Sequence, residues 1–323
     1  MTVTHWYYLA YRKKFLVIQV IFFYTCRSFG KNVYFIIISF CGNGIINKVE
    51  KYPFCKLLRK FAHIFEVMRT NYHTHTFRCM HAVGSDEDYV KSAICGGYQE
   101  LGFSDHTPWL YETDYVADMR MTVEELPDYV NSLKELKDKY KDRISIKIGL
   151  ECEYFENYIT WLKEIVRKYD LDYIIFGNHF YKTDEQFPYF GRYTTTYEML
   201  QLYEESILKG MESGLFAYVA HPDLFIRSYP QFDENCVNLS RKICKKARKM
   251  NIPLEYNVSG LEICKGNKEG YPHPTFWKIA ADEGCLSIVG MDAHDNRCLE
   301  NYALYDNAVK YLNKLGIRIV CNI

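Results

Sequence analysis

The 323-residue sequence lacks several features, and each absence excludes a class of protein. Its 12 cysteines include no C-x-x-C pair and no regular spacing, which argues against a zinc ribbon or a disulfide scaffold. Basic and acidic residues balance at 40 each, so no overall field attracts nucleic acid or an anionic membrane. There is no glycine-rich phosphate loop and no G-x-S-x-G motif, so kinase and serine-hydrolase mechanisms have no support. Scattered cysteines in a chain of this size suit a reducing compartment, and the predicted location is the cytoplasm.

Residues 1–67 lack the alternation of strands and helices that the remaining sequence shows. Two apolar runs, 15–24 and 33–40, are each shorter than the roughly 20 apolar residues that a membrane-spanning helix needs. Basic residues precede the first run, as in a signal peptide, but no small-x-small cleavage site follows it. Three interpretations stay open for this segment: an artefactual upstream extension, a membrane or interfacial anchor, or a packed element. A membrane partner is expected only if the segment is a real anchor.

From Met68 to the end of the chain, short apolar strands alternate with amphipathic helices. Strands are predicted at 67–75, 100–106, 144–154, 171–181, 216–224, 252–260 and 286–294. Helices are predicted after Ser85, after a capping box from Thr122 to Glu125, and around 195–213, 234–250 and 298–314. Repeated βα units imply parallel pairing, and residues 68–323 are long enough for a single β/α barrel.

Histidines and acids cluster at the carboxyl ends of these predicted strands. The candidate metal ligands are His73, His75, His81, His106, Glu151, His179, His221, Asp292 and His294. Because the carboxyl ends of barrel strands converge on one face, residues far apart in the sequence are expected to share one pocket. His73 and His75 form an i, i+2 pair, as do Asp292 and His294, and on a strand such pairs point to the same side. Only the sixth strand departs from the pattern, offering Glu255 instead.

Histidine and carboxylate ligands without cysteine suit Zn²⁺, Mn²⁺ or Fe²⁺. Nine candidate ligands exceed the roughly four to six that one ion takes, so two or three divalent ions are expected, with a carboxylate bridging them. Cys79 and Cys152 adjoin candidate ligands and are interpreted as packing residues. The remaining histidines, His5, His63 and His273, fall outside the pattern.

These motifs resemble those of the PHP (polymerase and histidinol phosphatase) family, and most closely its histidinol-phosphatase branch. They are H-x-H-T with F-x-C-x-H-A (73–82), G-F-S-D-H (102–106), G-L-E (149–151), G-x-H-F (177–180), A-H-P-D-L (220–224) and D-A-H (292–294). The resemblance covers residues 68–323 and implies an α/β fold, a distorted (β/α)₇ TIM-like barrel that holds three metal ions.

The resemblance also implies how the ligands divide. His73, His75, Glu151 and Asp292 would hold a first ion. His106, Glu151 and His179 would hold a second, which makes Glu151 the bridge in preference to Glu153, and His81, His221 and His294 would hold a third. Glu151, Asp292 and His294 are the residues expected at the centre of catalysis. Asp105 is expected either to orient His106 or to serve as a surface or capping residue.

The activity that the resemblance implies is hydrolysis of L-histidinol phosphate, a small-molecule phosphate ester, to L-histidinol and phosphate in histidine biosynthesis. Metal ions would activate the attacking water, so no protein nucleophile is required. Arg192 and Arg227 follow predicted strands and are expected to bind the phosphate, because a planar guanidinium binds phosphate bidentately. Glu255 is assigned to the amino group of the substrate, to packing in the barrel or to a supporting position behind the metal ligands.

Two alternative functions stay open. One is hydrolysis of another phosphomonoester, a nucleotide or an oligonucleotide end at the same site, although the neutral charge favours no nucleic-acid partner. The other is a non-catalytic module that keeps the barrel as a scaffold, but such a module would be free to lose ligands, and this chain keeps all nine. The sequence predicts no particular oligomeric state.

Overall fold

The computed structural model describes residues 16–23, 34–41, 44–46, 68–263 and 270–323. The chain divides into two compact units, residues 1–67 and residues 68–323. His5 and His63 lie outside the described residues.

The smaller unit contains a three-stranded antiparallel sheet. The two apolar runs form β1 (Leu16–Phe23) and β2 (Tyr34–Cys41), which pair along their full length, and β3 (Gly44–Ile46) pairs with β2. Both runs are therefore strands. Across the part of the chain that the structure describes, no helix has both the length and the apolar character that crossing a membrane requires. The three interpretations of residues 1–67 stay predictions.

A chain that starts at Met68 is expected to keep the melting temperature and the catalytic activity of the full chain. The reason is that residues 68–323 form a compact unit of their own, which contains every predicted ligand. Thermal unfolding and turnover of the truncated and full-length proteins, measured side by side, test this. Aggregation or a clear loss of activity on truncation would show that residues 1–67 pack on the barrel.

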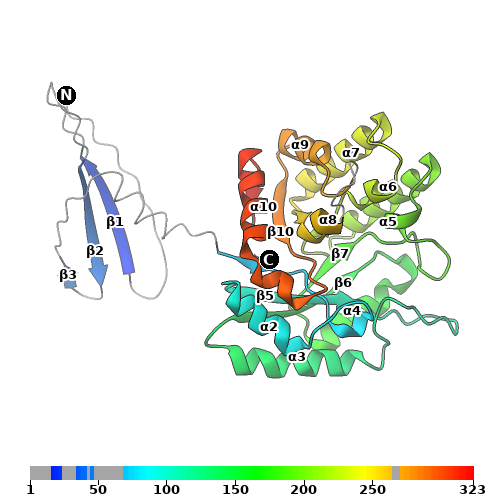
Figure 1. Ribbon diagram of the computed structural model, residues 1–323, viewed down its shortest axis with the longest axis horizontal. Helices are drawn as coiled ribbons and strands as arrows, with labels where there is room; N and C mark the ends of the chain where they lie inside the picture. Colours follow the sequence, from blue (N-terminus) through cyan, green and yellow to red (C-terminus); the bar gives the residue numbers. More distant parts are fainter. Residues whose placement is uncertain (1–15, 24–33, 42–43, 47–67, 264–269) are drawn as a thin grey trace. The chain divides into compact units, whose positions relative to one another are not determined.

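The larger unit is built around a parallel sheet of eight strands in the order β11-β10-β9-β8-β7-β6-β5-β4 (Figure 1). The strands are β4 (Thr70–Asn71), β5 (Glu100–His106), β6 (Ser145–Cys152), β7 (Tyr173–Gly177), β8 (Val219–Ala220), β9 (Leu254–Asn257), β10 (Leu286–Gly290) and β11 (Arg318–Ile319). The first seven of these confirm the seven predicted strands, and β11 is an additional short strand at the edge of the sheet. Sequential order with parallel pairing is the topology that repeated βα units produce.

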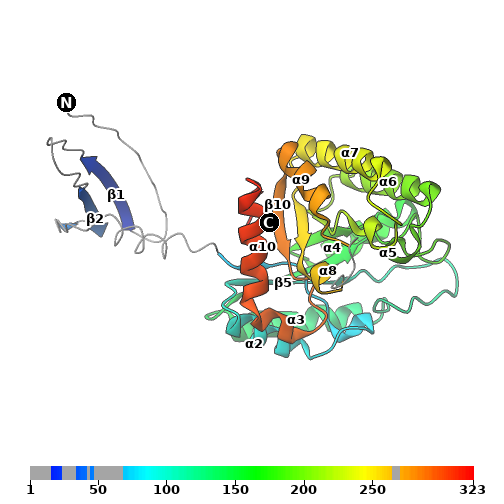
Figure 2. The ribbon, with the colours of Figure 1, turned by 45° about the horizontal axis from the view of Figure 1, so that its top comes forward.

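Helices cover the outside of the sheet, and α6, α7 and α9 lie side by side along it (Figure 2). The helices are α2 (Asp86–Cys95), α3 (Leu126–Tyr140), α4 (Ile159–Tyr169), α5 (Phe190–Tyr193), α6 (Tyr197–Glu212), α7 (Glu234–Met250), α8 (Val258–Ile263), α9 (Pro274–Asp282) and α10 (Tyr302–Lys314). Ser85 caps α2 as predicted, in a capping box with Asp88. The main hydrophobic core lies between the sheet and these helices, because each strand buries an apolar face against them.

The sheet curls until its two sides meet at the carboxyl end of the strands. The chain after β4 bridges the chain after β10, where the His75 N–H donates to the Ala293 carbonyl at 3.0 Å and the Ala293 N–H donates to the His73 carbonyl at 3.1 Å. At the other end, the Thr70 hydroxyl donates to the Cys321 carbonyl at 2.9 Å, just beyond β11. The predicted distorted (β/α)₇ barrel is confirmed as a fold class. β11 lies beside the line along which the two sides of the sheet meet.

The predicted capping box at Thr122 is wrong in detail. The Glu125 carboxylate accepts from the Thr122 N–H at 2.8 Å, but helix α3 begins at Leu126 with a proline in its first turn. Pro127 lies in the first turn of the helix, where proline is well tolerated because its missing N–H has no partner within the helix.

Candidate metal centre

Glu151, near the carboxyl end of β6, lies at the centre of the histidine cluster and is almost fully buried. Its Oε2 atom lies 3.4 Å from Nε2 of His73, 3.5 Å from Nε2 of His75 and 3.1 Å from Nδ1 of His106. These histidines come from the chain after β4 and from the end of β5. One carboxylate oxygen therefore faces three imidazoles from neighbouring strands.

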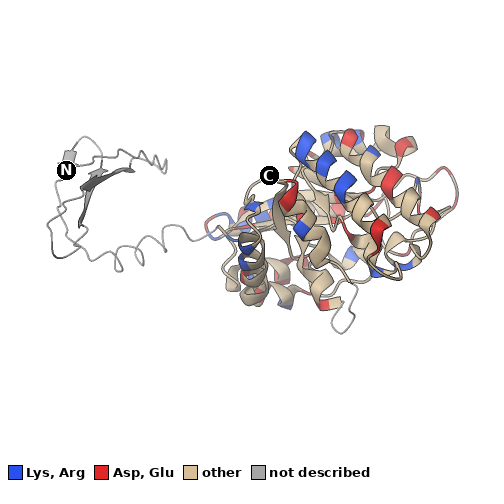
Figure 3. Cartoon of the chain, turned by 90° about the horizontal axis from the view of Figure 1, so that it is seen from above, with Lys and Arg blue, Asp and Glu red and all other residues tan. Residues whose placement is uncertain are grey.

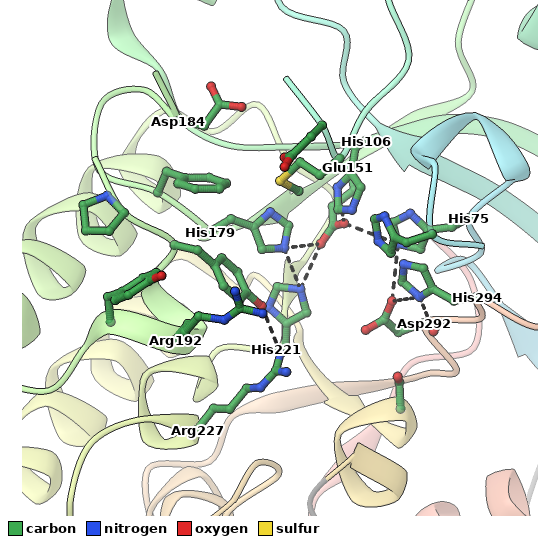
Figure 4. Close-up of a pocket in the computed structure, with 18 of the residues that line it drawn as sticks. His75, His106, Glu151, His179, Asp184, Arg192, His221, Arg227, Asp292 and His294 are labelled. Atoms are coloured by element: carbon green, nitrogen blue, oxygen red, sulfur yellow. Dashed lines mark hydrogen bonds and ion pairs between the residues drawn. The ribbon is translucent and has the colours of Figure 1, made fainter. Parts of the chain in front are cut away.

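The other oxygen of Glu151 faces a second group of histidines. Its Oε1 atom lies 3.3 Å from Nε2 of His179, which follows β7, and 2.9 Å from Nε2 of His221, which follows β8. The two Nε2 atoms are 3.2 Å apart. Because its two oxygens face separate groups of imidazoles, Glu151 has the geometry of a bridging carboxylate (Figure 4).

Asp292, after β10, completes the other side of the cluster. Its Oδ1 atom lies 3.5 Å from Nε2 of His73, 3.3 Å from Nε2 of His75 and 3.3 Å from Nδ1 of His294. The His294 ring stacks on His75 and on His81, with ring centres 4.0 and 4.6 Å apart. His81 is exposed and His294 is half-buried, so the cluster reaches solvent on this side.

A second observation, independent of these distances, shows that the cluster fits divalent metal ions. Several buried atoms of the cluster have no hydrogen-bond partner: His73 Nε2, His75 Nε2, His106 Nδ1, Glu151 Oε2 and His294 Nε2. Leaving buried polar atoms without partners costs about 1–3 kcal/mol each. A cation supplies a partner to all of them, and one group, His73, His75 and Asp292, already presents ligand atoms within 4.8 Å of one another.

The electrostatics of the cluster keep its carboxylates charged. Burial would raise the pKa of Glu151, but His179 and other nearby imidazoles hold that pKa well below its usual range. Burial would lower the pKa of His179, but Glu151 and Glu153 outweigh it and raise the pKa to about 9. Burial and the neighbouring His75 lower the pKa of His106 to about 3. A carboxylate binds metal in its charged form, and His179 would have to lose its proton to serve as a ligand.

Three histidines have their second ring nitrogen against a buried carboxylate. The pairs are His73 Nδ1 with Glu255 Oε1 at 2.8 Å, His75 Nδ1 with Asp105 Oδ1 at 3.4 Å and His179 Nδ1 with Glu153 Oε1 at 3.0 Å. Such contacts fix the orientation of a ligating imidazole and raise its basicity. The position of Glu153 behind His179 agrees with the prediction that Glu151, and not Glu153, is the bridge.

Asp105 is buried, which excludes the predicted surface role. It contacts a different imidazole from the one expected. Its carboxylate faces the ring of His75 and accepts from the Thr76 N–H at 3.1 Å and from the Thr76 hydroxyl. From His106 it accepts only the backbone N–H, at 2.8 Å. Asp105 therefore orients His75, and the prediction that it orients the ring of His106 is wrong.

Glu255, on β9, is fully buried and does not line the cavity. Oε1 faces His73, and Oε2 accepts from the His221 N–H at 3.0 Å and from Asn257 Nδ2 at 2.9 Å. Both oxygens are occupied by the protein, so the geometry does not support the contact with a substrate amino group. It supports the alternative position within the barrel, behind His73.

The geometry favours a different division of ligands from the one that the resemblance implies. His221 lies with His179 and Glu151, and not beside His81 and His294 as predicted for a third ion. His106 lies closer to that outer pair, because it shares a potential metal group with His75 and His294. The geometry thus favours an exchange of His106 and His221 between the predicted second and third sets.

The backbone has unusual φ angles at two of the candidate ligands and glycines beside the buried carboxylates. His221 and Asp292 have positive φ values of 28° and 48°, a region that residues other than glycine rarely adopt and that is often found at functional sites. A side chain on Gly177 would overlap the Glu151 carboxylate, and one on Gly290 would overlap Glu255. These two glycines make room for the carboxylates that organise the cluster.

A cavity of about 740 Å³ opens onto the metal ligands. Arg192, in α5, and Arg227, after β8, line it on the side of His221, and Asp184 lines it on the far side (Figure 4). Its walls are largely aromatic, formed by Tyr115, Phe180, Phe187, Tyr189, Tyr193 and Tyr271. The two arginines predicted from the sequence are therefore at the mouth of the same pocket as the ligands.

Sequence reasoning missed Tyr189. Its hydroxyl accepts a long hydrogen bond of 3.5 Å from Arg227 Nη1, and the Arg227 guanidinium lies 6.0 Å from the centre of its ring. Burial raises the pKa of Tyr189 to about 12, although Arg227 opposes the change, so the hydroxyl keeps its proton. The motif Y-F-G-R-Y, with aromatic residues on both sides of Arg192, was the available signal.

The two cysteines beside the ligands differ in their surroundings. Cys152 is buried on β6 and contacts the Thr107 hydroxyl at 2.8 Å, which agrees with a packing role. Cys79 is buried as well, but its carbonyl accepts from Nδ1 of His81 at 2.6 Å and its sulfur lies near His81 and His294. Burial would raise the pKa of the Cys79 thiol, but hydrogen bonds from His294, His75 and His81 lower that pKa to about 5.

Comparison with known proteins places this site in a family. A model of the PHP domain matches residues 71–259. A Deinococcus radiodurans protein described as "Probable histidinol-phosphatase" is 28% identical over 264 residues, covering 77% of this chain and 94% of that protein. The histidinol-phosphatase of Bacillus subtilis is 27% identical over 252 residues, covering 69% of this chain and 92% of that protein.

A solved structure has a similar fold. Histidinol phosphate phosphatase from Lactococcus lactis, crystallised with zinc, L-histidinol and phosphate, superposes with a TM-score of 0.61 and 18% sequence identity. The match covers 78% of this chain and 95% of that one. At this identity the likeness supports the barrel fold.

Proposed function

Because this chain belongs to the PHP-domain family, we propose that it is a metal-dependent phosphatase that hydrolyses L-histidinol phosphate to L-histidinol and phosphate. The observation that carries the proposal is the cluster of seven histidines around Glu151 and Asp292, at the floor of a cavity whose mouth carries two arginines. Relatives that match most of the larger unit are named histidinol-phosphatases. Phosphate release from L-histidinol phosphate by the purified protein tests the proposal.

The proposed metal centre holds two or three ions of zinc, manganese or iron. His73, His75 and Asp292 would hold one ion with Oε2 of Glu151, and His179 and His221 would hold another with Oε1. His81, His106 and His294 are the proposed ligands of a third. Bound cations would make a water a stronger nucleophile and offset the negative charge of the phosphoryl oxygens.

The remaining residues of the cavity are proposed to bind and orient the substrate. Arg192 and Arg227 would hold the phosphate over the ligands, with Arg227 steadied by the Tyr189 hydroxyl. The aromatic walls would exclude bulk water from the phosphorus and pack against the imidazole of the substrate. All the proposed ligands except His73 line the cavity, and among them Glu151, Asp292 and His294 are proposed to contact the reacting atoms.

Replacing Arg192 or Arg227 with Ala is expected to lower kcat/KM for L-histidinol phosphate by at least about tenfold, because loss of a hydrogen bond to a charged group costs about 1.5–3 kcal/mol. Bound metal should be unchanged in both variants. Arg143→Ala, at the exposed end of α3 before β6, is the matched control and should behave as wild type. Unchanged kcat/KM in both cavity variants at full metal loading would remove these arginines from the site.

The formal net charge of the whole chain is zero, which does not favour a nucleic-acid substrate. Figure 3 shows acidic and basic residues on the described helices, and the six basic residues of α7, between Arg241 and Lys249, do not line the cavity. We therefore propose a small phosphomonoester as the substrate. Cys79, Cys95, Cys152, Cys244, Cys285, Cys298 and Cys321 form no disulfide, which suits the proposed cytoplasmic location.

A further inference from the structure

Arg120 is a buried cation that the catalytic proposal does not use. It lies in the irregular segment 107–125, between β5 and α3, and is only 2% exposed. Nη1 donates to the Thr107 carbonyl and to Glu153 Oε2, both at 3.0 Å. Nη2 donates to Glu153 Oε1 at 3.0 Å and lies 2.9 Å from Asp184 Oδ2. One guanidinium thus fastens three separate stretches of chain.

Those three stretches follow β5, β6 and β7, which are neighbours in the sheet. Each of these strands also supplies a proposed metal ligand. Thr107 directly follows His106, Glu153 lies two residues after Glu151, and Asp184 lies five residues after His179. Arg120 therefore ties together the chain segments that carry three neighbouring ligands. No such role follows from the sequence motifs, because Arg120 lies far from all of them along the chain.

The contact from Arg120 through Glu153 reaches a ligand atom. Glu153 Oε1 faces both Nη2 of Arg120 and Nδ1 of His179, each at 3.0 Å. Its Oε2 also accepts from Trp109 Nε1 at 2.9 Å. With Nδ1 held by Glu153, the other nitrogen of the His179 ring is turned to Oε1 of Glu151, at 3.3 Å. The Glu153 carboxylate therefore fixes which nitrogen of His179 is offered to a metal.

The segment that carries Arg120 also forms one wall of the cavity. Tyr115, Asp118 and Met119 line the pocket immediately before it. Asp184, held by Arg120, lines the pocket too and accepts from the Tyr111 hydroxyl at 2.7 Å. Removal of the guanidinium would take away the cation that Glu153 and Asp184 share. Loss of one partner from a buried ion pair is strongly destabilising.

We propose that Arg120 is a positioning residue, which through Glu153 sets His179 for metal binding and fixes the cavity wall formed by segment 107–125. The inference rests on the proposed role of His179 as a ligand. A positioning role differs from a merely structural role in one measurable way. Replacement of a structural residue lowers stability alone, whereas replacement of Arg120 is expected to weaken the binding of one equivalent of metal.

The test is a zinc titration against a chromophoric chelator on the full-length protein, for wild type, Arg120→Gln, Arg120→Lys and Arg69→Gln. Loss of contacts behind a metal ligand typically weakens binding about 10- to 100-fold, and that loss is expected for one zinc equivalent in Arg120→Gln. Arg120→Lys keeps the charge without the planar fork and should give a smaller loss. Arg69, which pairs with Asp306 at 2.8 Å and precedes β4, whereas His73 and His75 follow that strand, is the matched control and should leave every equivalent unchanged.

Arg120→Lys decides the matter if Arg120→Gln does not fold, because it retains a cation beside both carboxylates. Selective weakening of one equivalent in either Arg120 variant, with Arg69→Gln unchanged, supports the inference. Wild-type affinity for all equivalents in the folded Arg120 variants would overturn it, whatever their melting temperatures. If the wild-type protein itself bound no zinc, manganese or iron, the proposed function would fail, and this inference with it.

Discussion

Replacement of Glu151 by Gln is expected to reduce phosphate release from L-histidinol phosphate by at least about a thousandfold, equivalent to about 4 kcal/mol, and to lower the bound metal. The reason is the position of its two oxygens. Oε2 faces His73 and His75, and Oε1 faces His179 and His221. A glutamine of the same shape presents an NH₂ group to one of these groups of imidazoles, and a neutral amide bridges two cations poorly.

The control for this variant lies two residues along the same strand end. Glu153→Gln removes a charge that is equally buried, but Glu153 contacts only one of the histidines, His179. Its effect is expected to be smaller and confined to one metal equivalent. Metal content and turnover should be measured on the same preparations. Near-wild-type activity in Glu151→Gln together with loss of activity in Glu153→Gln would show that the bridge has been assigned to the wrong acid.

Removal of metal by a chelator is expected to abolish turnover and to lower the melting temperature, and readdition of zinc, manganese or iron should restore both. The orphaned buried atoms of the cluster, such as His73 Nε2 and Glu151 Oε2, explain the loss of stability, because without a cation they are left without partners. A ligand that binds only the folded state stabilises it by an amount that grows with the logarithm of its concentration relative to Kd. An unchanged melting temperature after complete metal removal would contradict this account of the cluster.

Raising the pH should have opposite effects on two measured quantities. The stability of the metal-free protein should fall, and its apparent affinity for zinc should rise. His179 has its pKa raised to about 9, because Glu151 and Glu153 outweigh the effect of burial, while an unfolded histidine titrates near 6.5. The protonated ring therefore stabilises the stripped protein below about pH 6.5, and this stabilisation is lost as the pH rises to about 9. Metal competes with that proton, so apparent zinc affinity should rise across the same interval.

The gathering of the candidate ligands in one cluster could be predicted because most of them lie at or just after the end of a predicted strand. Parallel strands in a closed sheet bring those ends together whatever their separation in the sequence, so His73 and Asp292 meet although 219 positions separate them. Which ligands share an ion was harder to predict from motifs. The strand order supplies the physical reason for the correction, since β8, which precedes His221, pairs with β7, which precedes His179.

Which histidine each buried carboxylate contacts was outside the reach of sequence reasoning. Glu255 lies within a strand, and only the packing of the whole barrel decides that it faces His73 and not the cavity. Arg120 lies in an irregular segment with no periodicity, so nothing in its neighbourhood indicates a buried ion pair with Glu153. The two-residue strand β11 is too short to leave a pattern. These features depend on long-range contacts, which local propensity does not encode.

The central claim is most directly tested by phosphate release from a panel of substrates by the full-length protein, with its bound metals quantified in the same samples. The panel comprises L-histidinol phosphate, a mononucleotide, an aryl phosphate and the phosphorylated end of a single-stranded oligonucleotide. We expect kcat/KM for L-histidinol phosphate to exceed the others by at least about a hundredfold, because each well-placed polar contact to a substrate contributes roughly tenfold or more. Equal or better turnover of the oligonucleotide end or the nucleotide, or no turnover of any substrate by metal-loaded protein, would contradict it.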